Sequence, residues 1–201
     1  MSVALVLTER RADLTEARTR NYERLHARLA AASGLVIEDV HYDELGPGQL
    51  LRADAIVLSG SSAPWSVHEP TELARLGEAV RAAGRPVLGI CAGLQLQSLF
   101  AGGEIGPSAR EQRGFQPVTI RDRSDLLLGL GEEIVVFHDH TDEVTVLPEG
   151  FRVLASTAAC AVQAIADPER RWWGTQFHPE EFSSEHPAGE QILGNFFALI
   201  G

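Results

Sequence analysis

The chain has 201 residues, of which 44% are hydrophobic and 22% charged, a composition typical of one globular domain with a sizeable core. Its formal net charge of −11 argues against non-specific binding to nucleic acid or to membrane surfaces. All 17 basic residues are arginine, which excludes Schiff-base chemistry and Walker-type phosphate loops, because both need a lysine.

The N-terminal segment indicates a protein of the cytoplasm. The apolar run 3–7 is too short for a secretory signal and is followed at once by charged residues. No apolar run approaches the length that spans a membrane. We therefore expect both cysteines, Cys91 and Cys160, to be reduced, with Cys160 packed in the core.

The first half of the chain alternates apolar runs with helical patterns. Pro70 opens one predicted helix, and Gly34 and Gly84 follow the ends of two. This order favours a single α/β domain over residues 1–201, with a mostly parallel, flavodoxin-like central sheet flanked by helices. Ligands in such sheets bind at the carboxyl ends of the strands. The predicted elements are strands 3–7, 35–40, 55–58 and 86–90 and helices 13–32 and 70–83.

The second half has a different pattern, with short apolar runs separated by brief turns. This spacing predicts antiparallel hairpins that cover or extend the sheet. The chain closes on a helix from about residue 188, whose large apolar residues point inward. The short predicted strands are 118–121, 134–137, 144–147, 152–156, 161–165 and 172–177.

Cys91 lies between Gly89 and Gly93, where the strand 86–90 gives way to a helical pattern. Glycines on both sides of a strand-to-helix turn are the pattern of a nucleophile elbow, here with a thiol. The N–H groups and dipole at a helix N-terminus favour a thiolate. The alternative is a small buried core cysteine, which is common. The elbow spacing favours the nucleophile.

His178 and Glu180 form the second motif, within Gln176-Phe177-His178-Pro179-Glu180. A thiol nucleophile needs a base, and the base needs a group that orients it. Pro179 favours an extended His178, and residues two apart in an extended segment project to the same side. We therefore expect Glu180 to bond the imidazole and Glu181 to point away. The alternative is a surface turn with an incidental histidine.

Together these motifs resemble the class I glutamine amidotransferases, and the resemblance covers nearly the whole chain in the right order. The catalytic motifs carry it, and the others support it. The matching segments are Gly89-Ile90-Cys91-Ala92-Gly93-Leu94-Gln95, Gly174-Thr175-Gln176-Phe177-His178-Pro179-Glu180, Leu58-Ser59-Gly60, Asp139-His140-Thr141-Asp142-Glu143-Val144 and Gly194-Asn195-Phe196.

The resemblance implies a glutaminase without a cofactor. Cys91 attacks the glutamine amide carbon, His178 protonates the departing ammonia and then activates water against the thioester, and Glu180 holds the ring. By family position, the backbone N–H groups of Ser61 and Ala92 form the oxyanion hole. The implied substrate-binding residues are Gly60, Gln95, Asp139 and His140.

Two positions depart from the family pattern. Ser61 stands where the family has a second glycine, and a peptide that must flip does so less easily with a side chain present. Asp139 stands where serine or asparagine is usual. Its carboxylate would repel the substrate carboxylate unless it turns away, which could signal an amide other than free glutamine.

Three further interpretations remain open from the sequence. His138, His140 and Asp142 could form a metal cluster, although the resemblance explains this segment without a metal. The leading function is a glutaminase that supplies ammonia to a partner synthase or ligase subunit. The alternatives are a stand-alone hydrolase of γ-glutamyl amides with the same residues, and a catalytically silent regulatory or binding module.

Overall fold

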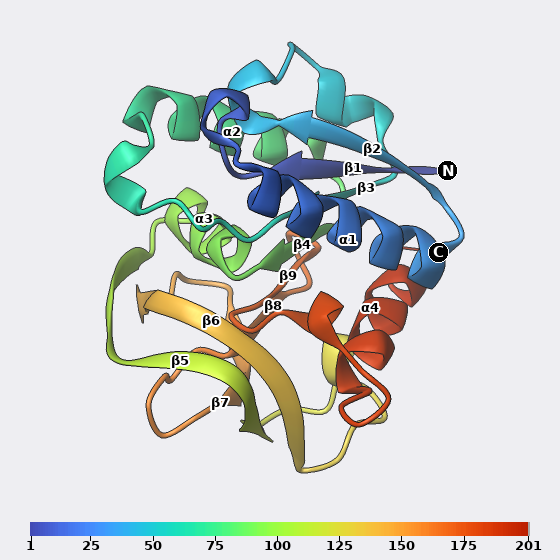
Figure 1. Cartoon of the computed structure of the whole chain (residues 1–201), viewed down its shortest axis with the longest axis vertical. Coiled ribbons are helices and arrows are strands. Elements are labelled where there is room, and N and C mark those ends of the chain that lie inside the picture. Colours follow the sequence, from blue (N-terminus) through green and yellow to red (C-terminus); the bar gives the residue numbers. More distant parts are fainter. Residues whose placement is uncertain (201) are drawn as a thin grey trace.

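The computed structural model describes residues 1–200 as helices packed on both faces of one nine-stranded sheet (Figure 1). The strand order is β2-β1-β3-β4-β9-β8-β7-β5-β6. No helix in these 200 residues is long and apolar enough to cross a membrane. The strands are β1 Ser2–Leu7, β2 Val36–His41, β3 Ala55–Leu58, β4 Val87–Ile90, β5 Glu104–Ile120, β6 Glu133–Val146, β7 Arg152–Ser156, β8 Ala164–Asp167 and β9 Trp172–Thr175; the α-helices are α1 Glu16–Ser33, α2 Pro70–Ala83, α3 Ala92–Phe100 and α4 Ala188–Ala198.

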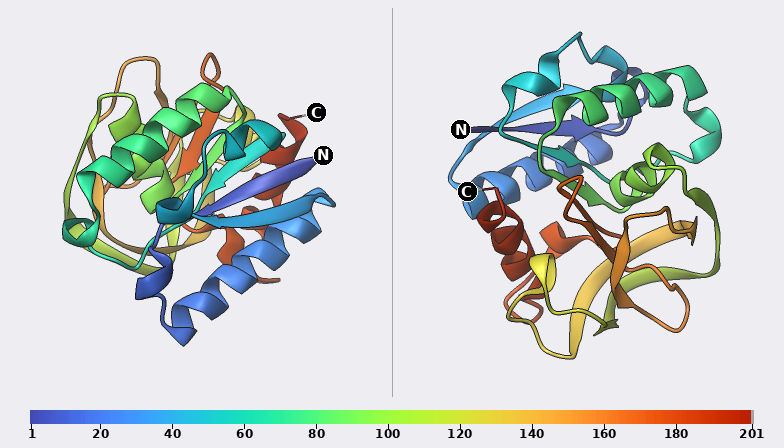
Figure 2. Two further views of the ribbon diagram at one scale, coloured as in Figure 1. Left: turned by 90° about the horizontal axis from the view of Figure 1, so that it is seen from above. Right: turned by 180° about the vertical axis from the view of Figure 1, so that it is seen from behind.

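The predicted α/β class is confirmed, and the first half follows the expected plan. Strands β2, β1, β3, β4 and β9 are parallel neighbours in that order, the flavodoxin-like arrangement. Helices α1 and α2 lie on opposite faces of this sheet (Figure 2). Thr15 caps α1 through its hydroxyl, which accepts from Arg18 N–H, so the helix begins three residues later than predicted.

Alternation along the buried strands divides the core between the two faces. Val3, Leu5 and Leu7 of β1 share one cluster with apolar residues of α1 and α4. Ala4 and Val6 of the same strand share the other cluster with residues of α2 and α3. Because successive strand residues point to opposite faces, a fully buried strand requires apolar residues at every position.

The second half extends the same sheet and makes it mixed, with four parallel and four antiparallel neighbour pairs. Two features differ from the prediction. β5 and β6 are single long strands, because Pro107 and Gly114 interrupt the apolar pattern of β5 without ending it, and a register shift follows Pro107. β9 joins the parallel core beside β4 as well as pairing with β8.

Three neighbouring strands end at the same edge of the sheet. β3 leads into the loop 59–64, β4 into Cys91, and β9 into the turn that holds His178. Because β3, β4 and β9 are adjacent and parallel, these segments meet although up to 119 residues separate them along the chain. This edge is where the candidate site forms.

Candidate active site

Cys91 occupies a strained turn between β4 and α3, with φ of 51° and ψ of −107°. A non-glycine residue adopts this conformation only when its surroundings enforce it. A Cβ on Gly93 would lie 2.2 Å from the Leu58 carbonyl oxygen, and one on Gly89 would lie 2.6 Å from that of Gly93. Glycines on both sides are therefore required for the turn, as the elbow spacing predicts. The Cys91 side chain is buried at the start of α3.

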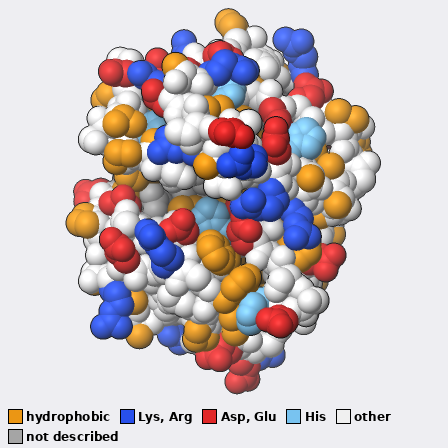
Figure 3. Space-filling view, viewed as in Figure 1, with side chains coloured by type: hydrophobic (Ala, Val, Ile, Leu, Met, Phe, Trp, Pro, Cys, Tyr) orange, Lys and Arg blue, Asp and Glu red, His pale blue; other side chains and the backbone are white. Residues whose placement is uncertain are grey.

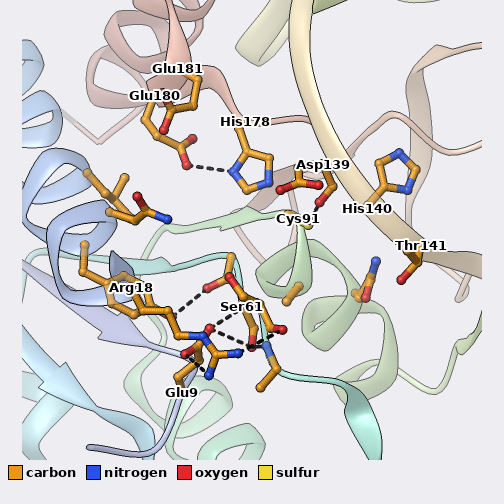
Figure 4. Close-up of a pocket in the computed structure, with 18 of the residues that line it drawn as sticks. Glu9, Arg18, Ser61, Cys91, Asp139, His140, Thr141, His178, Glu180 and Glu181 are labelled. Atoms are coloured by element: carbon orange, nitrogen blue, oxygen red, sulfur yellow. Dashed lines mark hydrogen bonds and ion pairs between the residues drawn. The ribbon is translucent and has the colours of Figure 1, made fainter. Parts of the chain in front are cut away.

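His178 and Glu180 meet next to this thiol. The imidazole Nδ1 donates to Glu180 Oε1 over 2.9 Å, and the His178 backbone N–H donates to the Phe137 carbonyl oxygen over 2.8 Å. Figure 4 shows Glu180 and Cys91 on opposite sides of the His178 ring. The three side chains predicted to act together are therefore brought together.

The local geometry behind this contact differs from the prediction. Residues Pro179–Glu181 form a 3₁₀ turn and not an extended segment, so the turn brings Glu180 back to the ring. Glu181 bonds elsewhere, as expected, because its carboxylate pairs with Arg24 at 2.6 Å. The predicted pair of His178 and Glu180 is correct, and the predicted extended backbone is wrong.

Electrostatics favour a charged His178. Burial of the ring lowers its pKa, but the nearby Glu180 carboxylate and the Cys91 thiolate raise it more, so the pKa of His178 stands well above its usual range. An imidazolium beside a thiolate is the resting state of an activated cysteine. This arrangement is suited to nucleophilic attack followed by proton transfer to a leaving group.

The thiol also has an amide neighbour that the sequence analysis did not single out. Gln176 Nε2 donates to Cys91 Sγ over 3.6 Å. Gln95 fixes the orientation of that amide, because Gln95 Nε2 donates to Gln176 Oε1 over 3.1 Å and Gln95 Oε1 accepts from Trp65 Nε1 over 3.0 Å. Since the indole is a donor only, the direction of the whole chain of bonds is set.

Two backbone N–H groups beside the thiol have no acceptor among residues 1–200: those of Ser61 and Ala92. Gly60 lies against the imidazole, where a Cβ would stand 2.9 Å from His178 Cε1 and 3.6 Å from Cys91 Cβ. A side chain at position 60 would therefore collide with the base. These are the groups predicted to form an oxyanion hole.

The other predicted substrate residues line the same cavity with different degrees of freedom. The Gln95 amide is fully engaged, since its Nε2 also donates to the Asp142 carbonyl oxygen over 2.8 Å. The Asp139 carboxylate turns away to Arg113, at 3.2 Å, while its carbonyl oxygen lies 3.9 Å from Cys91 Sγ. His140 is buried, and burial lowers its pKa, so the ring is neutral near pH 7.

The cavity has a volume of about 510 Å³, enough for a small amino-acid substrate. Figure 3 shows it as a hollow between the upper and lower halves of the molecule, with histidine visible inside and charged side chains around it. The lining residues include Tyr22, Gly60, Ser61, Cys91, Gln95, Asp139, His140 and His178.

Glu9 and Arg18 line this cavity, and the sequence analysis did not identify them. Glu9 is 1% exposed, accepts from Ser62 N–H, and pairs with Arg18 at 3.2 Å. Its position just beyond β1, at the same sheet edge as the other site loops, is the signal that could have identified it.

The metal alternative finds no support in the geometry of the described residues. No group of three or more histidine, cysteine or carboxylate side chains in residues 1–200 is placed to hold an ion. His138 is fully buried against Phe177, with both ring nitrogens unpaired, while His140 bonds through Nδ1 to the Asp142 carbonyl oxygen at 3.2 Å.

Comparison with known proteins identifies similar chains. Residues 18–200 match the family described as "Glutamine amidotransferase class-I". A glutamine-hydrolyzing GMP synthase of Syntrophomonas wolfei is 38% identical over 185 residues, which is 90% of this chain and 35% of that protein. One of the separate subunits of a glutamine-hydrolyzing GMP synthase, from Methanoregula boonei, is 42% identical over 116 residues, 58% of this chain and 62% of that protein.

A solved structure from Thermoplasma acidophilum, of a candidate GMP synthase subunit, has a TM-score of 0.82 and 28% identity. The match covers 98% of this chain and 94% of that one. In contrast, this chain spans about a third of the length of the first full GMP synthases that it matches.

Proposed function

This chain belongs to the class I glutamine amidotransferases, and we propose that it is the glutaminase subunit of a GMP synthase. It hydrolyses the side-chain amide of glutamine at Cys91 and passes the ammonia to a separate synthetase subunit. The observation that carries the proposal is the convergence of Cys91, His178 and Glu180, from segments far apart in the chain, on one cavity.

The reaction follows from the positions of these groups. Cys91 Sγ attacks the amide carbon of glutamine, and the carbonyl oxygen becomes an oxyanion that the N–H groups of Ser61 and Ala92 stabilise. The His178 imidazolium gives its proton to the amide nitrogen as the carbon–nitrogen bond breaks. Ammonia leaves, and a γ-glutamyl thioester remains on Cys91.

Water completes the cycle. The neutral His178 takes a proton from a water molecule as that water attacks the thioester carbonyl, and the same N–H groups stabilise the second oxyanion. Glutamate and the Cys91 thiolate are released, with His178 again protonated. Glu180 stabilises the imidazolium and holds the ring in one tautomer throughout, which its 2.9 Å bond to Nδ1 supports.

The need for a partner follows from the chemistry of the product. Ammonia released near neutral pH is mostly protonated and lost as a nucleophile, so it must pass directly to an acceptor site. The similarity to the separate GMP synthase subunits of Methanoregula boonei and Thermoplasma acidophilum supports a synthetase chain as that acceptor. We place the docking face around the mouth of the Cys91 cavity.

The structure removes one argument for the γ-glutamyl amide alternative. Asp139 is the feature that favours another substrate, and its carboxylate is paired with Arg113 and 55% exposed. It therefore leaves the cavity free for a substrate carboxylate. The unbonded N–H groups of Ser61 and Ala92 likewise support a competent site over a silent module.

A steady-state assay tests the proposal. We expect glutamate release from L-glutamine by the wild-type chain with the synthetase subunit of a GMP synthase present, and none by Cys91→Ser. We expect label from amide-¹⁵N glutamine in the GMP formed. Faster turnover of γ-glutamyl amines than of glutamine, or unlabelled GMP, would contradict the proposal.

A further inference from the structure

The carbonyl oxygen of Gly60 is surrounded by hydroxyl groups. Thr8 Oγ1 lies 2.8 Å from it, Ser59 Oγ 2.9 Å and Tyr22 Oη 3.1 Å, and each donates to it. Thr8 and Ser59 are 2% and 0% exposed, so no water competes for these bonds. Burial and the Glu9 carboxylate raise the pKa of Tyr22, which keeps the phenol protonated as a donor.

These contacts determine where the next N–H group points. The Gly60 carbonyl and the Ser61 N–H belong to one planar peptide, and in a trans peptide they point in opposite directions. The oxygen faces the buried hydroxyls, so the N–H faces away from them. On that side Gly60 lies against His178 and Cys91.

A second anchor holds the following peptide. The Ser62 N–H donates to Glu9 Oε1, and the Arg18 guanidinium pairs with Glu9 and donates to the Ser62 carbonyl oxygen over 3.4 Å. Ser61 Oγ accepts from Ala63 N–H over 3.1 Å. Figure 4 shows Glu9 and Arg18 beside Ser61, on the opposite side of the cavity from Glu180.

We propose that Thr8 and Tyr22 are positioning residues that hold the Gly60–Ser61 peptide with its N–H directed into the Cys91 cavity. The oxyanion hole is then complete in the isolated chain, and no partner has to flip this peptide. The proposal rests on the glutaminase function and adds a regulatory statement to it: binding of the synthetase subunit is not required for basal glutamine hydrolysis.

The test compares Tyr22→Phe and Thr8→Val, which each remove one hydroxyl and keep the shape of the side chain. Loss of one oxyanion donor costs about 10²–10³ in rate. Partial loss of its alignment lowers kcat by about tenfold for each variant and by about a hundredfold for the double variant. KM for glutamine stays within about twofold, because the hole stabilises the transition state and not the bound substrate.

Two controls separate this role from a merely structural one. Tyr42→Phe removes the only other tyrosine hydroxyl, which bonds His68 away from the cavity, and leaves kcat unchanged. Alkylation of Cys91 by iodoacetamide displaces iodide at a saturated carbon and forms no oxyanion. Its rate therefore stays the same in Tyr22→Phe and Thr8→Val.

Each outcome decides a specific point. Unchanged kcat in the double variant, or alkylation that slows as much as hydrolysis, overturns the positioning role. A wild-type chain that is inactive alone but active with the synthetase subunit overturns the inference and leaves the proposed function intact. A wild-type chain inactive under both conditions defeats the proposed function, and the inference with it.

Discussion

Replacement of Glu180 by glutamine tests the electrostatic basis of the site. The amide keeps the shape and an oxygen that can accept from His178 Nδ1, which now lies 2.9 Å from the carboxylate. Only the negative charge is lost. The exposed fractions of the two side chains, 17% for His178 and 8% for Glu180, are low enough that solvent screens the pair weakly.

The size of the effect follows from Coulomb's law. Opposite unit charges about 4 Å apart interact by about 4 kcal/mol at an effective dielectric constant of 20. Because about 1.4 kcal/mol corresponds to a tenfold change in rate, losing most of this stabilisation of the imidazolium lowers kcat by about 10²–10³. Glutamate release at saturating glutamine measures it.

The pH profile supplies the sign. Glu180 is one of the groups that raise the pKa of His178, so Glu180→Gln lowers it. The alkaline limb of the kcat profile, where the imidazolium loses its proton, therefore moves to lower pH. Glu181→Gln is the matched control, since that carboxylate pairs with Arg24 and should change kcat by less than about threefold. Equal losses in both variants would refute the assignment.

Three other substitutions test separate parts of the structure. Gln176→Leu removes the N–H that faces Cys91 Sγ and should lower both kcat/KM and the rate of iodoacetamide alkylation by about tenfold, whereas an unchanged alkylation rate contradicts a role for that amide. Gly93→Ala places a Cβ 2.2 Å from the Leu58 carbonyl oxygen and should lower the urea-unfolding free energy by about 1–3 kcal/mol or more. Burial, with the charges of the nearby histidines, lowers the pKa of His138 to about 4, so the unfolded chain binds a proton that the folded chain refuses and stability is lost as pH falls from 6.5 towards 4. His138→Leu should remove up to about 3 kcal/mol of that loss, measured by urea unfolding at pH 7 and pH 4.5, and an equal loss in both proteins would contradict the burial argument.

Much of the site could be predicted from the sequence because its signals are local. The glycines around Cys91 report a turn that only glycine permits, and the spacing of His178 and Glu180 reports a base with its orienting carboxylate. The parallel order of strands is similarly encoded in the alternation of apolar runs and helices. Each of these inferences needs only residues that are close together in the chain.

The remaining features depend on contacts between distant segments. The bonds from Thr8 and Tyr22 to Gly60 join residues 52 and 38 apart, and no local pattern predicts them. Pro107 and Gly114 hid the length of β5, because cross-strand pairing with β6 overrides their weak strand propensity. The carboxylate of Asp139 could not be placed without knowing that Arg113 lies beside it.

The central claim is that Cys91 carries the glutamyl group during turnover, and acid-quenched mass spectrometry tests it directly. The chain is mixed with excess L-glutamine, quenched within one turnover and digested. We expect a γ-glutamyl adduct on the peptide that contains Cys91, and none in Cys91→Ser. Burial raises the pKa of the Cys160 thiol to about 12, which makes it unreactive. An adduct on Cys160, or glutamate release without any adduct on Cys91 at every quench time, would contradict the account.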